Sequence, residues 1–443
     1  MAQPAVITGV FDGRFRAASS AEASLAAVTG FTGRCAQILL VPDQGGRTTV
    51  HLGLGSQECW RPEHGYQAMA GLYGLNLDPS ACATDSLLTA MSEVTDRSLA
   101  EEIVDTGLRL AVGDDERGPS PGRPAGAHVA VAIRHARSWT NATAAQLDPR
   151  NFADLARGVA DDSDLDISVI SGDALRENGF GAIHAMGAGS SRPPALVDLR
   201  YRPAEPTTRI ALVGKGVTFD TGGLSLKSPA AMSGMRQDKC GAATVLAVMS
   251  VLARLDVRAE VRALLPLVEN MIGPQGFRPG DVVQAWDGTN IQVLDTDFEG
   301  RVILADALAY AAADQPDLVV DIATLTYQVV TALGPSIGGL FARDDAVADL
   351  LQSAAARAGE PLWRLPYDTR YLDQVLTPSG VKNHPETDSG RAITAALFLG
   401  RFVPDAVAWA HLDITGPAWS GAPSSAGATG FGVRTLLTLL RAS

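Results

Sequence analysis

The segment RIALVGKGVTF (residues 209–219), followed by CGAATVLAVMSVLARL (residues 240–255), decides the fold class. The first has the continuous apolar run of a strand buried on both faces, and the second has the pattern of a long apolar helix. The same alternation continues to the C-terminus, with strands expected at 258–268, 317–325 and 406–414 and helices at 301–313, 392–403 and 432–442. This order predicts an α/β fold whose mixed, mostly parallel central sheet is covered by helices.

The first third of the chain has shorter elements and predicts a smaller α/β domain. Strands are expected at residues 5–11, 36–41 and 48–55, and helices at residues 20–28 and 98–112. These segments lack the long apolar runs of the later part.

One stretch is typical of a linker or an exposed loop. Residues 113–126, GDDERGPSPGRPAG, are dense in glycine, proline and charge. We expect an N-terminal α/β domain at 1–128, a mainly helical connection at 129–165 and the main domain at 166–443.

Composition excludes several classes of protein. The 443 residues are 46% hydrophobic and 19% charged, which provides a large core and excludes general disorder. The formal net charge of −13 makes nucleic acid an unlikely partner, because phosphate binding needs clustered positive charge. No apolar run reaches 18 residues, so no membrane span is expected.

Cysteine usage and the first residues predict a cytoplasmic protein. The four cysteines are scattered and form no C-x-x-C motif, which suits a reducing compartment. Charged residues at 12 and 14 interrupt any apolar segment of a signal peptide.

Lysine is scarce and unevenly placed. Only four of the 36 basic residues are lysines, and three of them, Lys215, Lys227 and Lys239, fall within 25 positions. Lysine can lose its proton in a protein whereas arginine cannot, so lysines retained in an arginine-rich chain point to chemistry.

Carboxylates gather where the predicted strands end, which is where covered sheets bind ligands. The residues are Asp220 in GKGVTFDTGGLSLK, Asp238 in GMRQDKCGAA, and Asp297 and Glu299 in LDTDFEGR. Asp297 and Glu299 would share one face of an extended backbone. Four converging carboxylates need a compensating charge, and a pair of divalent metal ions supplies it most simply. Lys215 can join such a site as a neutral amine.

Each of these residues also has an ordinary structural interpretation. Asp238 is a good helix N-cap, and Asp220 before two glycines suits a turn. Glu299 and Arg301 can form a solvated pair of little energetic value. Lys239 is expected to be solvated.

Other catalytic motifs are absent from the sequence. No histidine is followed by glutamate, so there is no H-E-x-x-H zinc helix, and neither a Walker loop nor G-x-S-x-G occurs. His411, in an apolar strand, is expected to be a satisfied core residue.

The metal-site segments resemble the leucine aminopeptidase family, the two-metal cytosol aminopeptidases. VGKGVTFDTGGLSLK, VENMIGPQGFRPGDVV and DTDFEGRVILADAL resemble three family blocks, and DIATLT, WAHLDITGPAW and GATGFGVRTLL resemble later ones. The resemblance covers roughly residues 129–443. It implies that 166–443 is a catalytic two-metal peptidase domain.

The resemblance also implies a role for each matching position. Lys215, Asp220, Asp238 and Glu299 would hold one metal ion, and Asp220, Asp297 and Glu299 the other, with Zn, Mn or Co as candidate metals. Lys227 would polarise the scissile carbonyl and stabilise the tetrahedral state. Arg301 would hold a bicarbonate that acts as general base. The family further implies a peptide substrate and a homo-hexamer built as a dimer of trimers.

Several positions depart from the family pattern. The fingerprint Asn-Thr-Asp-Ala-Glu-Gly-Arg has Asp295 and Phe298 in place of its Asn and Ala, and LTPSGVKN replaces a Ser-Asp-x-Ala-Asp stretch. Tyr327 and Thr415 stand where the family has small residues. Together with Met235 and Thr324, these two residues would line the pocket for the N-terminal side chain, so a remodelled pocket is expected.

The sequence therefore predicts a metal-dependent aminopeptidase with narrowed or altered first-residue specificity. One version trims a precursor peptide, as family members in ribosomal-peptide antibiotic clusters such as that of bottromycin do. The alternatives are a non-catalytic or DNA-binding regulator on the same fold, and a dipeptidase for substrates such as Cys-Gly.

Overall fold

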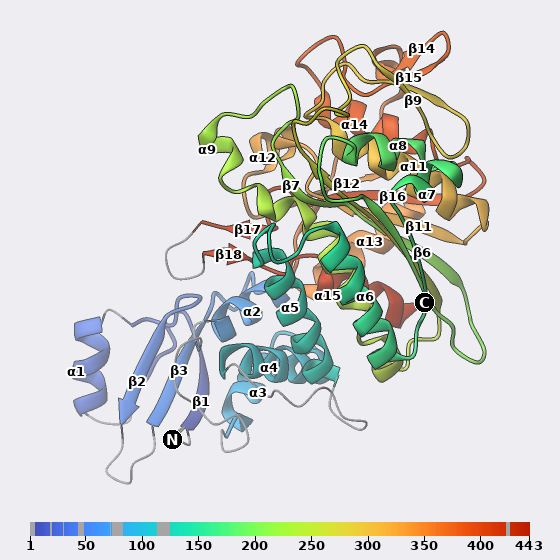
Figure 1. Cartoon of the computed structure of the whole chain (residues 1–443). Helices are drawn as coiled ribbons and strands as arrows, with labels where there is room; N and C mark the ends of the chain where they lie inside the picture. The colour runs from blue at the N-terminus through green and yellow to red at the C-terminus, as the bar shows by residue number, and fades with distance from the viewer. Residues whose placement is uncertain are drawn as a thin grey trace. The chain divides into compact units, whose positions relative to one another are not determined.

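The computed structural model describes residues 5–17, 20–29, 31–42, 48–70, 72, 83–112, 125–421 and 426–443. They belong to two compact units (Figure 1), Met1–Val131 with Ala355–Glu360 and Ala132–Ala354 with Pro361–Ser443. Most of the expected linker, residues 113–124, lies outside the described residues.

The smaller unit contains a three-stranded sheet in the order β1-β3-β2. β1 runs parallel to β3, and β2 runs antiparallel to it. Its strands and main helices are β1 (Ala5–Phe11), α1 (Ser20–Thr29), β2 (Ile38–Pro42), β3 (Thr48–Gly55), α2 (Pro62–Ala70), α3 (Asp85–Ser92) and α4 (Arg97–Val112). The three strands and the helices α1 and α4 lie where the sequence predicts them.

The larger unit is built on a nine-stranded sheet in the order β13-β12-β16-β11-β6-β8-β5-β4, with β7 also paired to β8. Its strands are β4 (Asp166–Ser171), β5 (Ala195–Tyr201), β6 (Arg209–Gly214), β7 (Gly216–Asp220), β8 (Glu260–Asn270), β11 (Leu318–Ala323), β12 (Gly338–Ala342), β13 (Leu362–Arg364) and β16 (Ala408–Asp413). The central strands β16, β11, β6 and β8 are mutually parallel, whereas β4, β5 and β12 pair antiparallel with their inner neighbours. The predicted mixed, mostly parallel sheet is confirmed.

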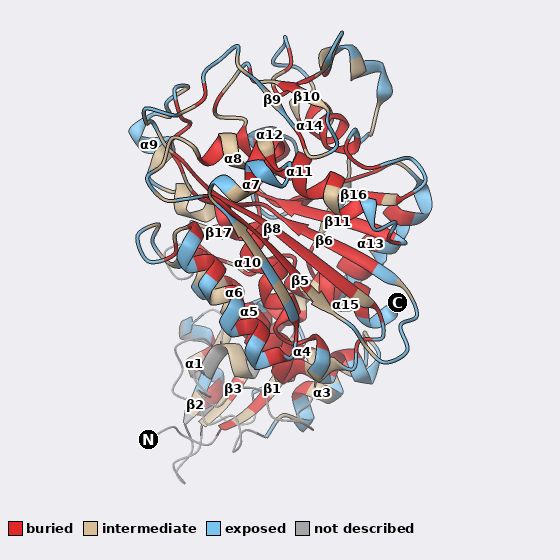
Figure 2. Ribbon diagram, turned by 45° about the vertical axis from the view of Figure 1, so that its right-hand side comes forward, coloured by how far each residue is buried: buried red, intermediate tan, exposed pale blue. Residues whose placement is uncertain are grey.

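Helices cover both faces of this sheet (Figure 2). The helices of the larger part of the chain are α5 (Ala125–Asn141), α6 (Pro149–Ser163), α7 (Asp173–Glu177), α8 (Gly181–Gly187), α9 (Pro229–Met232), α10 (Cys240–Met249), α11 (Glu299–Ala313), α12 (Tyr327–Leu333), α13 (Asp345–Ala358), α14 (Arg391–Gly400) and α15 (Val433–Ala442). α8, α11 and α14 lie on one face, and α6, α10 and α15 on the other. Both faces are apolar for that reason, and β11 is buried along its whole length.

The hydrophobic pattern of the sequence does not predict the short strands and turns. A second small sheet joins β14 (Leu376–Thr377), β15 (Gly380–Lys382), β10 (Asn290–Gln292) and β9 (Val282–Gln284). A further pair is β17 (Trp419–Ser420) and β18 (Gly427–Ala428), and 3-10 turns are η2 (Met235–Lys239), η3 (Leu252–Leu255) and η4 (Thr369–Gln374). Strands of two or three residues have no measurable alternation, so pairing partners rather than local pattern define them.

The topology brings several chain segments to one edge of the sheet. β7 ends at Asp220, β8 at Asn270, β11 just before Thr324, and β16 at Asp413. Because these strands are parallel, their carboxyl ends meet at a single edge, as expected for a ligand site. Among the described residues, no helix is both long and apolar enough to cross a membrane.

Candidate active site

Three carboxylates converge at this edge. Asp220, Asp297 and Glu299 each offer an oxygen, and these oxygens lie within 4.8 Å of one another. Asp220 ends β7, Asp297 sits in a turn, and Glu299 opens α11. The prediction of an extended backbone at 297–299 is wrong. Asp297 lies in a turn and Glu299 is the first residue of α11, and this turn brings the two carboxylates together.

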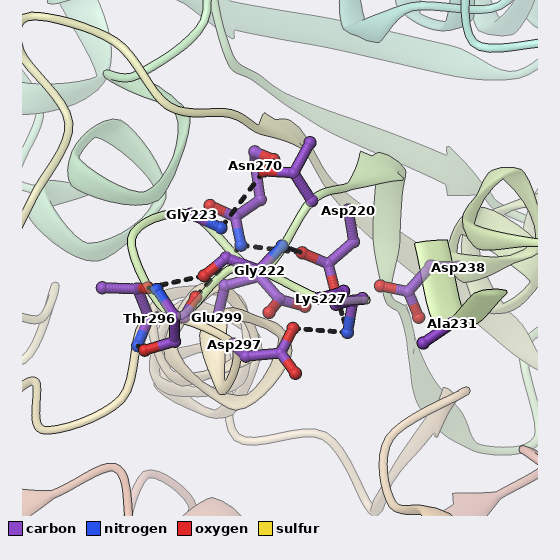
Figure 3. A network of polar contacts seen from close by, with 12 residues as sticks. Asp220, Gly222, Gly223, Lys227, Ala231, Asp238, Asn270, Thr296, Asp297 and Glu299 are labelled. Carbon is purple, nitrogen blue, oxygen red and sulfur yellow. Dashed lines mark hydrogen bonds and ion pairs between the residues drawn. The ribbon is translucent and has the colours of Figure 1, made fainter. Parts of the chain in front are cut away.

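The ammonium group of Lys227 lies between two of these carboxylates (Figure 3). Its Nζ is 2.7 Å from Oδ2 of Asp220 and is also paired with Oδ1 of Asp297. Asp220 uses its other oxygen to accept 2.8 Å hydrogen bonds from Gly222 N and Asn270 Nδ2. Asp220 is therefore both the predicted turn residue and a member of the cluster.

A second lysine, Lys215, reaches the cluster from the position between β6 and β7. Nζ of Lys215 donates 2.8 Å hydrogen bonds to Oδ1 of Asp238 and to the Thr324 carbonyl, and it lies 3.3 Å from Oε1 of Glu299. Oγ1 of Thr324 donates to the same Asp238 oxygen at 2.8 Å. All five metal-site residues expected from the sequence thus lie in one contiguous network with Lys227.

The network crowds negative charge in a buried setting, which shifts its pKa values. Burial, together with Asp220 and Glu299, raises the pKa of Asp297 to about 7. Burial raises the pKa of Asp238 to about 8, although Lys215 opposes this. Burial alone would lower the pKa of Lys215, but Asp238 and Glu299 outweigh it and raise that pKa. Near neutral pH, the cluster consequently retains protons that isolated carboxyl groups have already lost.

Three buried oxygens of the network accept no hydrogen bond from the described residues: Oδ2 of Asp238, Oε2 of Glu299 and Oδ1 of Asp297, the last of which is ion-paired with Lys227. Buried carboxylate oxygens without a partner are costly. Divalent cations prefer such oxygens, and bridging carboxylates about one cluster suit a pair of ions. The donor set therefore fits the two metal ions expected from the sequence.

Arg301 lies next to this cluster, on the first turn of α11. Its side chain is buried, and Nη1 donates a 3.0 Å hydrogen bond to the Asn383 carbonyl. Burial lowers its pKa to about 9, against the opposite effect of Glu299 and Asp413, and the neighbouring Arg391 lowers it further. A desolvated guanidinium beside a second one is a favourable place for an anion.

The four expected pocket residues have different environments. Thr324 is buried, whereas Met235 and Thr415 are half-buried. Tyr327 begins α12 and is 73% exposed, so its side chain lies in solvent rather than in a packed wall. Oγ1 of Thr415 donates a 2.6 Å hydrogen bond to Asp413, so this added hydroxyl is occupied within the protein.

The ordinary interpretations of three residues are wrong. Asp238 lies within η2, and the N-cap of α10 is Lys239, which makes no side-chain cap. Lys239 is fully buried and donates to the carbonyls of Ala142 and Arg236 at 2.8 Å. Glu299 and Arg301 are both buried and cannot be a solvated pair.

Sequence reasoning missed three residues that hold the site together. Asn270 Nδ2 joins Asp220 to the Thr296 carbonyl, Asn383 accepts from Arg301, and Asp413 binds two loops. Asn270 and Asp413 end buried strands and Asn383 directly follows β15. The same strand-end pattern that indicates Asp220 also indicates Asn270 and Asp413, whereas Asn383 follows a three-residue strand that has no pattern of its own.

A family description matches most of the larger unit. The cytosol aminopeptidase family, catalytic domain, matches residues 134–437. The chain belongs to the cytosol aminopeptidase family. The match begins in α5 and ends in α15, so it includes every site residue described above.

Individual proteins resemble the chain over different lengths. The bottromycin maturation enzyme BotP has a TM-score of 0.86 and 36% identity, covering 100% of this chain and 99% of that chain. A cytosol aminopeptidase from Coxiella burnetii has a TM-score of 0.82 and 30% identity, covering 99% and 97%. A probable cytosol aminopeptidase of Cutibacterium acnes is 40% identical over 335 residues, covering 74% of this chain and 66% of its own length. The alignment thus spans about two thirds of that curated relative.

Proposed function

We propose that this member of the cytosol aminopeptidase family removes the N-terminal residue from peptides with a free α-amine in a metal-dependent hydrolysis. The observation that carries the proposal is the buried network of four carboxylates and two lysines at the sheet edge. Hydrolysis would break the first peptide C–N bond, add the oxygen of water to the carbonyl carbon and pass a proton to the leaving amine.

The residues divide into two proposed ligand sets. Lys215, Asp220, Asp238 and Glu299 would hold one divalent ion, and Asp220, Asp297 and Glu299 the other. Such ions supply an anchor for the α-amine and lower the pKa of bound water. Zn, Mn and Co are the candidate metals. Mn is supported by a structure of BotP in complex with Mn, whose sequence is 35% identical to this chain.

The two remaining functional residues act on the carbonyl and on the base. Lys227 has its ammonium beside Asp220 and Asp297, from where it would donate to the scissile carbonyl oxygen and stabilise the charge that develops there. Arg301 would hold a bicarbonate ion as the general base toward water, because its buried guanidinium favours an anion.

The similarity to BotP over the full length of both chains supports a specialised, precursor-trimming role. Met235, Thr324, Tyr327 and Thr415 would line an altered pocket for the first side chain, in which the exposed phenol of Tyr327 would meet the substrate while the Thr415 hydroxyl bonds to Asp413. We also propose a cytoplasmic homo-hexamer, a dimer of trimers, which mass photometry of the purified protein would test.

A peptide library tests the function. Metal-stripped protein is supplied with Mn, Co or Zn and mixed with free-amine peptides and their N-acetylated counterparts, and products are read by mass spectrometry. We expect loss of one residue from free-amine peptides only, with a narrow set of first residues. The Glu299→Gln variant is the matched control and should release nothing. Equal cleavage of acetylated peptides, or activity without metal, would contradict the proposal.

A further inference from the structure

The aromatic ring of Phe298 lies against the guanidinium of Arg301. Cζ of Arg301 is 4.5 Å from the ring centroid, and Cζ of Arg391 is 5.6 Å from it. Both distances are within the range of cation–π attraction. Phe298 is the residue immediately before α11, so the ring and the guanidinium come from neighbouring turns of the same segment.

Stacking and hydrogen bonding use different parts of a guanidinium. Cζ of Arg301 lies over the ring of Phe298, and all five N–H donors of a guanidinium lie in the plane of the group. A ring under Cζ therefore takes no hydrogen-bond donor from the guanidinium. Among the described residues, the carbonyl of Asn383 is the hydrogen-bond acceptor of the Arg301 side chain, so the other N–H donors would serve an oxyanion.

The ring is itself held from the side. The rings of Phe298 and His384 meet edge to face with centroids 4.6 Å apart. His384 follows Asn383, whose side chain accepts from the backbone of Leu294 and Asp295 and donates 2.7 Å to the Asp295 carbonyl. Phe298, His384, Asn383 and Arg301 thus form a closed circuit of contacts.

We propose that Phe298 is a positioning residue that fixes the plane of the Arg301 guanidinium, so that its free N–H edge is set to bind bicarbonate. This inference rests on the proposed function, because it assigns the anion to Arg301. The ring orients the guanidinium, and the Asn383 carbonyl fixes one of its N–H groups. Neither residue contacts the oxygens of the anion. An alanine at position 298 would remove the aromatic ring that contacts the Arg301 guanidinium.

Two substitutions distinguish the effect of the aromatic ring from the effect of side-chain volume. Phe298→Leu keeps an apolar side chain but removes the π face, and Phe298→Tyr keeps the face. Each metal-free protein is titrated with bicarbonate at fixed pH and ionic strength, and the thermal midpoint reports binding. Initial rates of the Mn-loaded proteins at varied bicarbonate provide a second readout. Phe152→Leu on α6, a buried Phe in the same unit, controls for general loss of stability.

We expect Phe298→Leu to bind bicarbonate about ten-fold more weakly, a size within the range of a desolvated cation–π contact. Phe298→Tyr should stay within about two-fold of wild type, and Phe152→Leu should lower the midpoint without changing the bicarbonate response. If Phe298→Leu does not fold, Phe298→Met makes the same comparison. Equal losses in the Leu and Tyr variants, an unchanged Leu variant, or a wild-type protein that ignores bicarbonate would overturn the inference. Failure of the proposed function gives a different result: no peptide cleavage with any metal, while the metal-free bicarbonate titration still decides the role of Phe298.

Discussion

The hydroxyl of Thr415 donates a 2.6 Å hydrogen bond to Oδ1 of Asp413, a fully buried carboxylate at the end of β16. The backbone N–H of Thr415 donates to the same oxygen. On the other side, Asp413 accepts from the N–H groups of Leu325 and Thr326 and from the Thr326 hydroxyl at 2.6 Å. Asp413 therefore ties the loop after β11 to the loop after β16, the two loops that carry Thr324, Tyr327 and Thr415.

This arrangement predicts that Thr415 acts on stability more than on substrate choice. Thr415→Val keeps the side-chain shape but removes the donor to a charged acceptor, so we expect a loss of about 1–2 kcal/mol in the free energy of unfolding. Relative kcat/KM values across first residues should change by less than about three-fold, since the hydroxyl already faces Asp413. Urea denaturation and a panel of aminoacyl substrates measure both. A large change in first-residue preference with unchanged stability would show that the hydroxyl serves the substrate.

Lys227 is predicted to act on the chemical step. Lys227→Gln removes the ammonium near Asp220 and Asp297, and we expect kcat to fall about 100-fold, as on loss of one donor to a developing oxyanion. Affinity for Mn²⁺ should be unchanged or higher, because the variant lacks a cation that competes for the same carboxylates. Steady-state kinetics and calorimetry check the two effects. Weaker metal binding would instead assign Lys227 a role in holding the site together.

The strand ends allowed the catalytic edge to be predicted from the sequence. Apolar runs such as residues 209–214 fix a strand buried on both faces, so the polar residues that follow, Lys215 and Asp220, must lie at its end. His411 is a buried core residue as predicted, with Nδ1 2.5 Å from Oδ1 of Asp321, but it is not fully satisfied, because its Nε2 is buried without a hydrogen-bond partner among the described residues.

Side-chain direction could not be predicted in the same way. Lys239 is fully buried although a solvated position was expected, because it is fixed by carbonyls of Ala142 and Arg236 that only the tertiary fold brings together. The turn at Asp297 and the direction of the Thr415 hydroxyl likewise depend on contacts between segments far apart in the chain. Periodicity contains no information about such contacts.

Gly300 is predicted to be essential for the approach of Lys215. A Cβ at this position would lie within 2.5 Å of Lys215 Nζ. Gly300→Ala should therefore displace the lysine and weaken Mn²⁺ binding by roughly ten-fold, as for other changes that disturb metal ligands. Alanine itself favours the helix by about 0.5–1 kcal/mol, so loss of α11 would not be the cause.

Gly158→Ala on α6 is the matched control, because nothing lies within 4 Å of a Cβ there. It should bind Mn²⁺ as wild type does in a calorimetric titration. A Gly300→Ala protein with wild-type affinity would show that Lys215 can move aside at no cost, and would remove it from the proposed ligand set.

Proton release on metal binding follows from the raised pKa values of the cluster. In the metal-free protein the pKa is about 7 for Asp297 and about 8 for Asp238. A metal ion must displace these protons and that of Lys215, whose pKa is raised by Asp238 and Glu299, so apparent Mn²⁺ affinity should rise with pH through and above this range, with net proton release. Calorimetry in two buffers of different ionisation enthalpy measures the protons directly. Affinity independent of pH between 6 and 8 would show that the carboxylates are already ionised.

The same pKa shift sets the sign of a stability change in the metal-free protein. Folded Asp297 keeps its proton between about pH 4 and about pH 7, where an unfolded aspartic acid has lost it. The unfolded state then binds fewer protons than the folded state, so the free energy of unfolding falls as pH rises through that window. Asp297→Asn should flatten the fall, because its amide does not titrate, and should also remove part of the repulsion from Asp220 and Glu299. Urea denaturation of both metal-free proteins at several pH values would show the difference, and parallel pH profiles for the two proteins would mean that Asp297 is ionised throughout.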